Sequence, residues 1–339
     1  DNEVAVITVA GGQASRLGFQ GPKGAYPLGE QSGISLFQFM AEQILEIRKK
    51  YSCHLPWVIQ TGPDNHTETI AFFLNRNWFG LPSSSVHFVC QGTLPALYPD
   101  GQLVFSDVNT VFRNPDGHGG VYRALKNANT LDKLEGQGIK FLYYCQVDNP
   151  LVFIADPIFI GHHLSNKAEM SVKVVEKRDP SEKVGLVVEQ NGSIQCVEYS
   201  DIDESLQKKR AEDGSLFLRA GNIAIHAYNL DFFKKMAEAE LPLHLAHKKS
   251  NVFNVKKHIF EETEVVKFET FVFDALPLAS KAIVQLADRN LEFSPVKNRE
   301  GNDSIKTSRE AIRDRASLLE RELLNKEPYQ TFVRLSSSR

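Results

Sequence analysis

Short apolar runs alternate along this chain with segments in which apolar residues recur at helical spacing. The first run, residues 4–10 (VAVITVA), is too short to span a membrane and predicts a strand buried on both faces of a parallel sheet. Residues 36–47 have a helical pattern, and a second helix is expected after Asn65, with Glu68 three residues later as in a capping box. Strands that alternate with helices predict βαβ units. The further strand-like runs are residues 56–62, 86–92, 140–152, 170–177, 217–228 and 263–276.

The second half of the chain departs from a purely parallel pattern. Residues 184–200 contain two strand-like runs joined by Asn191-Gly192, a strong signal for a type I′ hairpin turn, so the sheet is expected to be mixed. A charged helix is predicted from about 305 to 325. A stretch with linker-like composition begins after residue 295. We therefore predict a large domain, 1–295, and a mostly helical C-terminal segment, 296–339.

Composition narrows the class of protein. With 339 residues, 42% hydrophobic and 24% charged, the chain has the material for one large or two modest globular cores. A net charge of -3 gives no overall attraction to nucleic acid or to an anionic membrane, so neither is expected as a partner. The sequence has no apolar span of 18 residues and no signal peptide. It starts without Met, and whether its termini have been truncated is left open.

The four cysteines indicate a reducing compartment. Cys53, Cys90, Cys145 and Cys196 are far apart and form no C-x-x-C pair. Two of them, Cys90 and Cys145, lie inside apolar strand-like runs, where buried and reduced thiols are expected. A cytoplasmic protein is therefore predicted.

A glycine pair follows the first strand and is followed in turn by two basic residues. Gly11 and Gly12 lack the Cβ atoms that keep ligands away from a backbone, so their N–H groups can bind an anion at the carboxyl edge of the sheet. Arg16 and Lys23 add positive charge beside them. A plain glycine turn with two solvated basic side chains is an equally good interpretation of these residues alone.

Two better-known phosphate loops do not match this segment. A Walker loop requires a terminal Gly-Lys-Ser/Thr, which is missing here. A dinucleotide fingerprint requires G-x-G-x-x-G and an acidic residue at the end of the second strand, but the run 56–62 ends in Gln60, Thr61 and Gly62.

Two carboxylates end apolar runs. Asp148 in VDNP and Asp274 in FVFD could converge on one divalent cation, although capping of the next turn is the ordinary role of each alone. His118 lies in the glycine-rich PDGHGG, which would admit a flat base or sugar, or would simply form a tight loop. The pairs His162-His163 and His244/His247 lack zinc-site spacing and a third ligand.

The segment AGGQASRLGFQGPKG (10–24) resembles the signature of the UDPGP family, the eukaryotic-type uridylyltransferases. Later segments resemble its UDP-N-acetylhexosamine pyrophosphorylase branch and occur in family order over roughly residues 4 to 300. They are CQGTLPAL, PDGHGGVYRAL, VDNPLV, KVVEK, VGLVV, VEYSDI, AGNIAIH, FVFD and EFSPVKN.

The resemblance implies an α/β fold, a Rossmann-like three-layer α/β/α nucleotidyltransferase with a mixed central sheet. It further implies a reaction of UTP with a sugar 1-phosphate that gives a UDP-sugar and pyrophosphate, with Mg²⁺ or Mn²⁺ as cofactor. N-acetylglucosamine 1-phosphate is the favoured sugar substrate. The residues that it implicates are Arg16, Lys23 and Lys297 for catalysis, Gly11, Gly12, Gln91 and Gly117 for the nucleotide, His118, Gly185, Glu198 and Asn222 for the sugar, and Asp148 and Asp274 for the metal.

The chain departs from the family in two places. His118 replaces the Asn that is typical of the N-acetylhexosamine branch and is also found in UDP-glucose pyrophosphorylases, which are therefore the main alternative. The sequence is also expected to lack the family's extension before the first strand and most of its C-terminal β-rich region, as either a truncated sequence or a compact bacterial-type member would. A non-catalytic nucleotide-sugar sensor and a nicotinamide oxidoreductase are weaker alternatives, and the oligomeric state is open.

Overall fold

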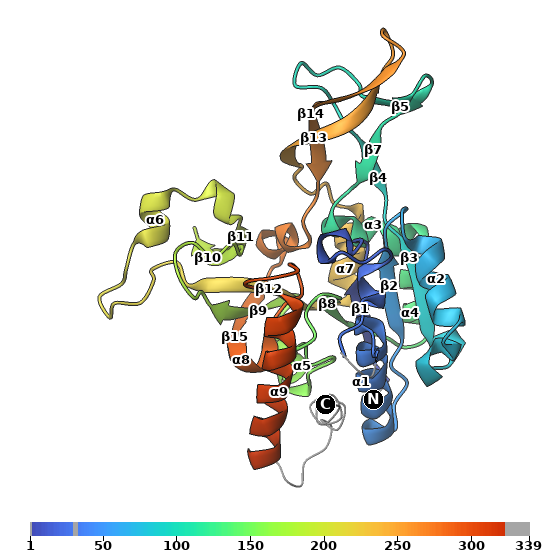
Figure 1. The fold of residues 1–339 in the computed structure, drawn as a ribbon. Coiled ribbons are helices and arrows are strands. Elements are labelled where there is room, and N and C mark those ends of the chain that lie inside the picture. Colours follow the sequence, from blue (N-terminus) through green and yellow to red (C-terminus); the bar gives the residue numbers. More distant parts are fainter. Residues whose placement is uncertain (1, 30–32, 323–339) are drawn as a thin grey trace.

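The computed structural model describes residues 2–29 and 33–322, and its centre is a nine-stranded sheet (Figure 1). Strand β1 (Val4–Val9) lies between β8 (Phe141–Gln146) and β2 (Trp57–Thr61), parallel to both. The strands run in the order β11-β10-β12-β8-β1-β2-β3, and β9 pairs with β12 and β15. The other strands of this sheet are β3 (Val86–Cys90), β9 (Met170–Glu176), β10 (Leu186–Gln190), β11 (Ser193–Val197), β12 (Ala220–Asn229) and β15 (Ala282–Leu286).

The mixed sheet is confirmed, and its strand directions determine which loops meet. Strand β12 is antiparallel to both β8 and β9, and β15 is parallel to β9. Strands β1, β2, β3, β8, β9 and β15 therefore all end at one edge of the sheet, the edge where open α/β sheets bind ligands. The β10–β11 hairpin also forms as predicted, with positive φ at both Asn191 (53°) and Gly192 (75°), as a type I′ turn requires.

Helices cover both faces of the sheet. In β1, Val6 packs into one core with Phe37 of α1, whereas Ile7 packs into the other with Phe233 of α7. This alternation produces the predicted three layers. The helices are α1 (Leu36–Tyr51), α2 (His66–Leu74), α3 (Val121–Asn127), α4 (Thr130–Gly136), α5 (Pro157–Ser165), α6 (Glu204–Lys208), α7 (Leu230–Glu238), α8 (Arg289–Glu292) and α9 (Ile305–Glu322), with 3-10 turns at Ser15–Leu17, Lys23–Ala25, Asn77–Gly80, Ser83–Ser85, His118–Gly120, Tyr199–Asp201 and Val272–Leu278.

A small β-arm extends from the carboxyl edge of the sheet, at the top of Figure 1. Its long hairpin, β13 (His244–Asn254) and β14 (Ile259–Glu269), pairs through β13 with β5. A separate apolar cluster, Ala96, Val104, Val252 and Val265, holds the arm together. Its short strands are β4 (Thr93–Pro95), β5 (Phe105–Asp107), β6 (Thr110–Val111) and β7 (Arg113–Pro115).

One strand prediction is wrong at its end. The run 263–276 was expected to be a single strand ending near Asp274, but β14 stops at Glu269 and Val272–Leu278 form a 3-10 turn. The Asp274 carboxylate accepts a hydrogen bond from the Phe271 backbone nitrogen at 3.2 Å, and such a cap favours a turn over a continued strand. Asp274 therefore lies inside a turn and does not end a strand.

All four cysteines are free thiols, but their burial differs from the prediction. Cys145 is fully buried, whereas Cys90 is exposed. Cys90 is the last residue of β3, and β3 is an edge strand of the sheet, so the apolar run does not enclose it.

The C-terminal segment packs on the sheet domain as far as it is described. Ile312 and Ala316 of α9 belong to the same core as α1, and Val296 packs against Ala14 and Leu17. Residues 323–339 of the predicted segment 296–339 lie outside the described residues. No helix within residues 2–29 and 33–322 is long and apolar enough to cross a membrane.

Candidate functional site

The glycine loop follows β1 directly. A Cβ atom on Gly11 would lie 2.4 Å from Gln91 Oε1 and 3.2 Å from the Gly62 nitrogen, so a side chain here would displace Gln91 and press on the backbone of the neighbouring loop. Gly12 is exposed, and a Cβ atom there would meet nothing within 4 Å. Crowding explains Gly11, whereas Gly12 leaves backbone accessible to a ligand.

Asn65 holds this loop in place. Its side-chain amide donates to the Ala10 carbonyl at 2.9 Å and the Gly12 carbonyl at 3.2 Å, and its oxygen accepts from the Gly62 nitrogen at 2.9 Å. The sequence pattern predicted Asn65 as a helix cap, but its side chain makes no capping bond to α2. No local pattern distinguishes these two uses, because two of the three bonded groups lie more than 50 positions away in the chain.

Asn65→Ala should destabilise the protein and loosen the glycine loop. Asn65 is 1% exposed, so its loss leaves buried backbone groups without partners, and we expect unfolding free energy to fall by about 2–3 kcal/mol. Urea unfolding measures this change. Asn75→Ala is the matched control, because Asn75 is the exposed residue at the other end of α2 and should change stability by less than about 0.5 kcal/mol. Equal losses in the two variants would contradict the role of Asn65.

Lys23 and Asp148 form the ion pair at the centre of the site. The Lys23 ammonium donates to Asp148 Oδ2 at 3.0 Å, and the two side chains are only 19% and 13% exposed. The Lys23 backbone nitrogen also donates to the Gly12 carbonyl at 3.1 Å, which ties the basic residue to the glycine loop. Burial alone would raise the pKa of Asp148, but the nearby Lys23 and Lys297 hold it below its ordinary value.

Lys297, from the other end of the chain, lies close enough to Asp148 to help lower the pKa of its carboxylate. The Val296 nitrogen donates to the Asp148 carbonyl at 2.8 Å, so the segment that carries Lys297 runs beside Asp148. The structure thus brings together Lys23, Asp148 and Lys297, residues that are far apart in the sequence. Arg16 lies in the same glycine loop but is exposed.

Gln91 and Gly117 meet beside the glycine loop. The Gln91 amide donates to Asp116 Oδ1 and to the Gly117 carbonyl, both at 3.3 Å. Gly117 has a φ of 84°, and a Cβ atom on it would lie 2.4 Å from the Thr270 carbonyl. Only glycine fits at this position, where the loop packs against the chain that leaves β14.

His118 faces aromatic side chains. Its ring stacks on Phe271 with centroids 5.1 Å apart, and its Nδ1 accepts a hydrogen bond from the Val272 nitrogen at 3.0 Å. Nδ1 is therefore unprotonated and the ring is neutral. Burial, with a smaller contribution from His244, lowers the pKa of His118 from its ordinary 6.5 to about 4.

His118 should make stability depend on pH. The unfolded chain takes up a proton near pH 6.5 and the folded one only near 4, so the contribution of the neutral ring is complete above 6.5 and is lost as the pH falls toward 4. Relative to His118→Asn, wild-type unfolding free energy should fall by up to about 1.4 kcal/mol per pH unit in this window. Chemical denaturation at several pH values measures the difference. His247→Asn changes an exposed site and keeps His118, so this variant should keep the wild-type slope.

Three of the four predicted sugar residues, Gly185, Glu198 and Asn222, gather around the β10–β12 junction. The Asn222 nitrogen donates to the Gly185 carbonyl at 2.8 Å. A Cβ atom on Gly185 would approach Glu198 Oε1 to 3.2 Å, so Glu198 lies directly beside this contact. Burial and the neighbouring Asp201 raise the pKa of Glu198, and Lys297 and His244 are close enough to oppose the rise. The structure therefore joins the predicted sugar residues to the Lys297 side of the site.

Asp274 is paired with His244, a residue that the sequence analysis rejected as a zinc ligand and interpreted as an ordinary surface or core histidine. His244 Nε2 lies 2.9 Å from Asp274 Oδ2, and the His244 ring stacks on Phe271 at 4.1 Å. Burial raises the pKa of Asp274, and the contact with His244 opposes that rise. This pair lies near Glu198, and its two members are 30 positions apart in the sequence.

A preformed metal cage is missing from the part of the chain that the structure describes, where no three or more His, Cys, Asp or Glu side chains are grouped to hold an ion. Mg²⁺ at nucleotide sites is commonly held by one or two carboxylates together with substrate phosphates. Asp148, an ionised carboxylate next to the glycine loop, fits that requirement.

Known proteins match nearly the whole chain. The family model described as UTP–glucose-1-phosphate uridylyltransferase matches residues 1–329. A UDP-N-acetylglucosamine pyrophosphorylase from Saccharomyces cerevisiae is 40% identical over 322 residues, covering 91% of this chain and 67% of the yeast protein.

Solved structures agree with this match. A structure from Entamoeba histolytica, assigned as a UDP-N-acetylglucosamine pyrophosphorylase, has a TM-score of 0.87 and 32% identity, covering 95% of this chain and 83% of that one. A UDP-N-acetylglucosamine pyrophosphorylase from Trypanosoma brucei, in complex with an inhibitor, has a TM-score of 0.85 and 27% identity, covering 100% and 71%.

Proposed function

Because the chain belongs to the UDPGP family of uridylyltransferases, in its UDP-N-acetylhexosamine pyrophosphorylase branch, we propose that it joins UTP and N-acetylglucosamine 1-phosphate into UDP-N-acetylglucosamine and pyrophosphate. The observation that carries the proposal is the meeting of Lys23, Asp148 and Lys297 beside the glycine loop. This group offers two positive charges for the phosphates of two substrates and one carboxylate for a divalent cation.

The reaction requires positioning more than proton transfer. A sugar phosphate oxygen is already ionised at neutral pH, so it can attack the α-phosphorus of UTP without a base. In the proposed roles, Lys297 holds the sugar phosphate, while the Gly11-Gly12 backbone, Arg16 and Lys23 bind the nucleotide phosphates. Lys23 and Arg16 then stabilise the negative charge that develops on the leaving pyrophosphate.

Asp148 is the proposed protein ligand of the divalent cation, with Mg²⁺ or Mn²⁺ as the cofactor. The bound ion would neutralise phosphate charge during the in-line displacement. Since the Lys23 ammonium lies on the same Asp148 carboxylate, its donation keeps that carboxylate ionised and oriented. A second ligand role for Asp274 stays a prediction, and its pairing with His244 competes with that role.

We assign the base and the sugar to opposite sides of the three residues Lys23, Asp148 and Lys297. Gln91 and the Gly117 backbone are proposed to bind the uracil edge. Gly185 is proposed to contact the sugar, and Glu198 and Asn222 to form hydrogen bonds with its hydroxyl or acetamido groups. His118 is the remaining residue proposed to contact the sugar, and its ring stacks on Phe271.

Pyrophosphate release from UTP and Mg²⁺ with four sugar 1-phosphates tests the proposal. N-acetylglucosamine and N-acetylgalactosamine 1-phosphates should be turned over faster than the glucose and galactose compounds. A preference for glucose would instead support the UDP-glucose pyrophosphorylase alternative, for which His118 is the relevant residue. UDP-sugar binding without pyrophosphate release would support a sensor, and binding of NAD(P) would support an oxidoreductase.

A further inference from the structure

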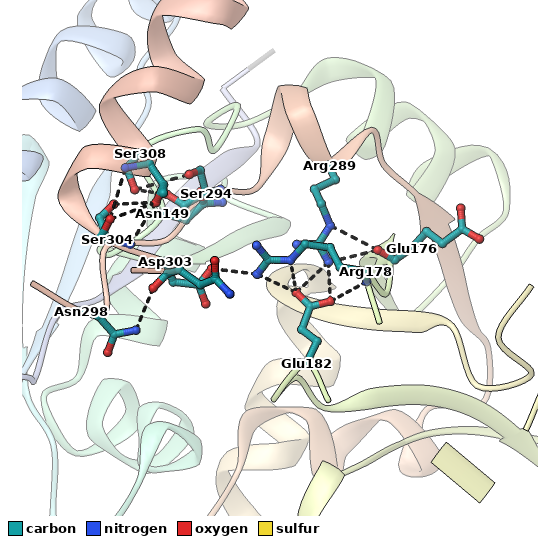
Figure 2. Close-up of polar contacts among 12 residues, drawn as sticks. Asn149, Glu176, Arg178, Glu182, Arg289, Ser294, Asn298, Asp303, Ser304 and Ser308 are labelled. Atoms are coloured by element: carbon teal, nitrogen blue, oxygen red, sulfur yellow. Dashed lines mark hydrogen bonds and ion pairs between the residues drawn. The ribbon is translucent and has the colours of Figure 1, made fainter. Parts of the chain in front are cut away.

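A charged cluster lies beside Asn298, the residue that follows Lys297 (Figure 2). Glu182, whose side chain is 8% exposed, is its centre: Arg178 and Arg289 each donate to the Glu182 carboxylate at 3.0 Å. Arg178 also donates to Asp303 Oδ1 at 3.0 Å. We call these four residues, Arg178, Glu182, Arg289 and Asp303, the Glu182 cluster. It joins the loop after β9, the start of α8 and the loop before α9.

The cluster is joined to Lys297 through the backbone of Asp303. The Asp303 carbonyl accepts hydrogen bonds from the nitrogens of Lys297 at 2.7 Å and Asn298 at 3.0 Å, which closes the loop 297–303. The Asp303 side chain, in turn, is the acceptor for Arg178. A displacement of Asp303 would therefore move the backbone of Lys297 directly.

The conformation of Asp303 points to a use for its carboxylate. Its φ is 54°, in the left-handed region that favours glycine, and Gly301 two residues earlier also has a positive φ of 77°. A turn that needs only this backbone shape would be served equally well by glycine. Aspartate at this position adds the ion pair with Arg178.

Residues 294–303, which we call the Lys297 segment, are also held by hydrogen bonds between uncharged groups, as Figure 2 shows. Asn149, next to Asp148, accepts from the Ser294 nitrogen at 3.1 Å, and the Ser308 hydroxyl donates to the Ser294 carbonyl at 2.7 Å. These contacts join the Lys297 segment to Asp148. The Glu182 cluster joins it to the loop 177–183, which leads into Gly185 and the sugar side.

We propose that the Glu182 cluster positions Lys297 for the phosphate of the sugar 1-phosphate, with Arg178 and Asp303 as positioning residues. This inference depends on the proposed function, in which Lys297 binds that phosphate. The cluster sets the distance between Lys297 and the sugar side of the site, because Arg178, in the loop 177–183, pairs with Asp303, whose carbonyl holds the Lys297 backbone, while Arg289 holds the Glu182 carboxylate that Arg178 also contacts. Its loss should therefore weaken sugar 1-phosphate binding and leave UTP binding unchanged.

Arg178→Met and Asp303→Gly, singly and together, test the proposal in the full chain. The KM for N-acetylglucosamine 1-phosphate should rise about tenfold in each single variant, and the double variant should be no worse, because both changes break one interaction. The KM for UTP should change less than about twofold. Asp303→Gly keeps the left-handed backbone favourable, so a purely backbone role predicts wild-type kinetics. Lys208→Met removes an exposed ion pair with Glu204 on α6 and is the control.

Hydrogen exchange at the Lys297 and Asn298 amides gives a readout independent of activity. Exchange should be faster in Arg178→Met and in Asp303→Gly, with melting temperatures and UTP affinity that show intact folding. Unchanged exchange, unchanged KM for the sugar 1-phosphate, or multiplying effects in the double variant would overturn the positioning role. An inactive wild-type protein would instead refute the proposed function, and the exchange experiment would still decide whether the cluster orders the Lys297 loop.

Discussion

Lys23→Ala is expected to lower turnover by about 10²–10³-fold, the loss typical of removing one preorganised charge from a transition state. UDP-sugar affinity should fall far less, by under about tenfold, because the product complex lacks the departing pyrophosphate. The variant removes the ammonium that lies 3.0 Å from Asp148 and is attached through its backbone to the glycine loop. Steady-state kinetics and calorimetric titration with UDP-N-acetylglucosamine measure the two quantities.

Lys140→Ala is a matched control for that variant. Lys140 precedes β8 and pairs with Glu3, whereas Asp148 follows β8 and pairs with Lys23, so the two ion pairs lie at opposite ends of the same strand. The Lys140 side chain is 64% exposed, and its loss should leave turnover within about twofold of wild type. Equal losses of turnover and of UDP-sugar binding in Lys23→Ala would refute its role at the leaving group.

Asp148→Asn should be the second most damaging change. The amide keeps the size of the side chain but loses the negative charge that both Lys23 and a divalent cation require. We expect turnover to fall by about 10²-fold or more and the Mg²⁺ concentration for half-maximal rate to rise. A magnesium titration of pyrophosphate release at saturating substrates measures both effects.

Asp274→Asn belongs in the same titration, because Asp274 is the other predicted metal ligand. A raised magnesium requirement in that variant would assign Asp274 to the metal. An unchanged requirement would indicate that Asp274 serves only in its pair with His244. If Asp148→Asn keeps the wild-type magnesium requirement, the assignment of Asp148 to the cation is wrong.

Local patterns predicted most of the fold. The buried strand β1, the glycines after it and the type I′ turn at Asn191-Gly192 could all be identified from neighbouring residues. Each depends on interactions within a few positions of the chain. A strand buried on both faces selects apolar residues, and a turn with positive φ selects asparagine or glycine. The arm hairpin was missed in part because β13 carries mostly polar and charged residues on an exposed ribbon.

The sequence by itself determined the parallel strands, the turn at Asn191-Gly192, the family and the candidate residues, because these follow from local composition and from ordered motifs. Only the tertiary structure decided how those residues are used. In the folded chain, Asn65 holds the glycine loop and does not cap a helix. Asp274 pairs with His244, and Lys297 lies near an aspartate 149 positions earlier in the sequence. The physical reason is that strands of one direction end at one edge, so residues remote in sequence share one small volume, and their charges and hydrogen bonds are set there.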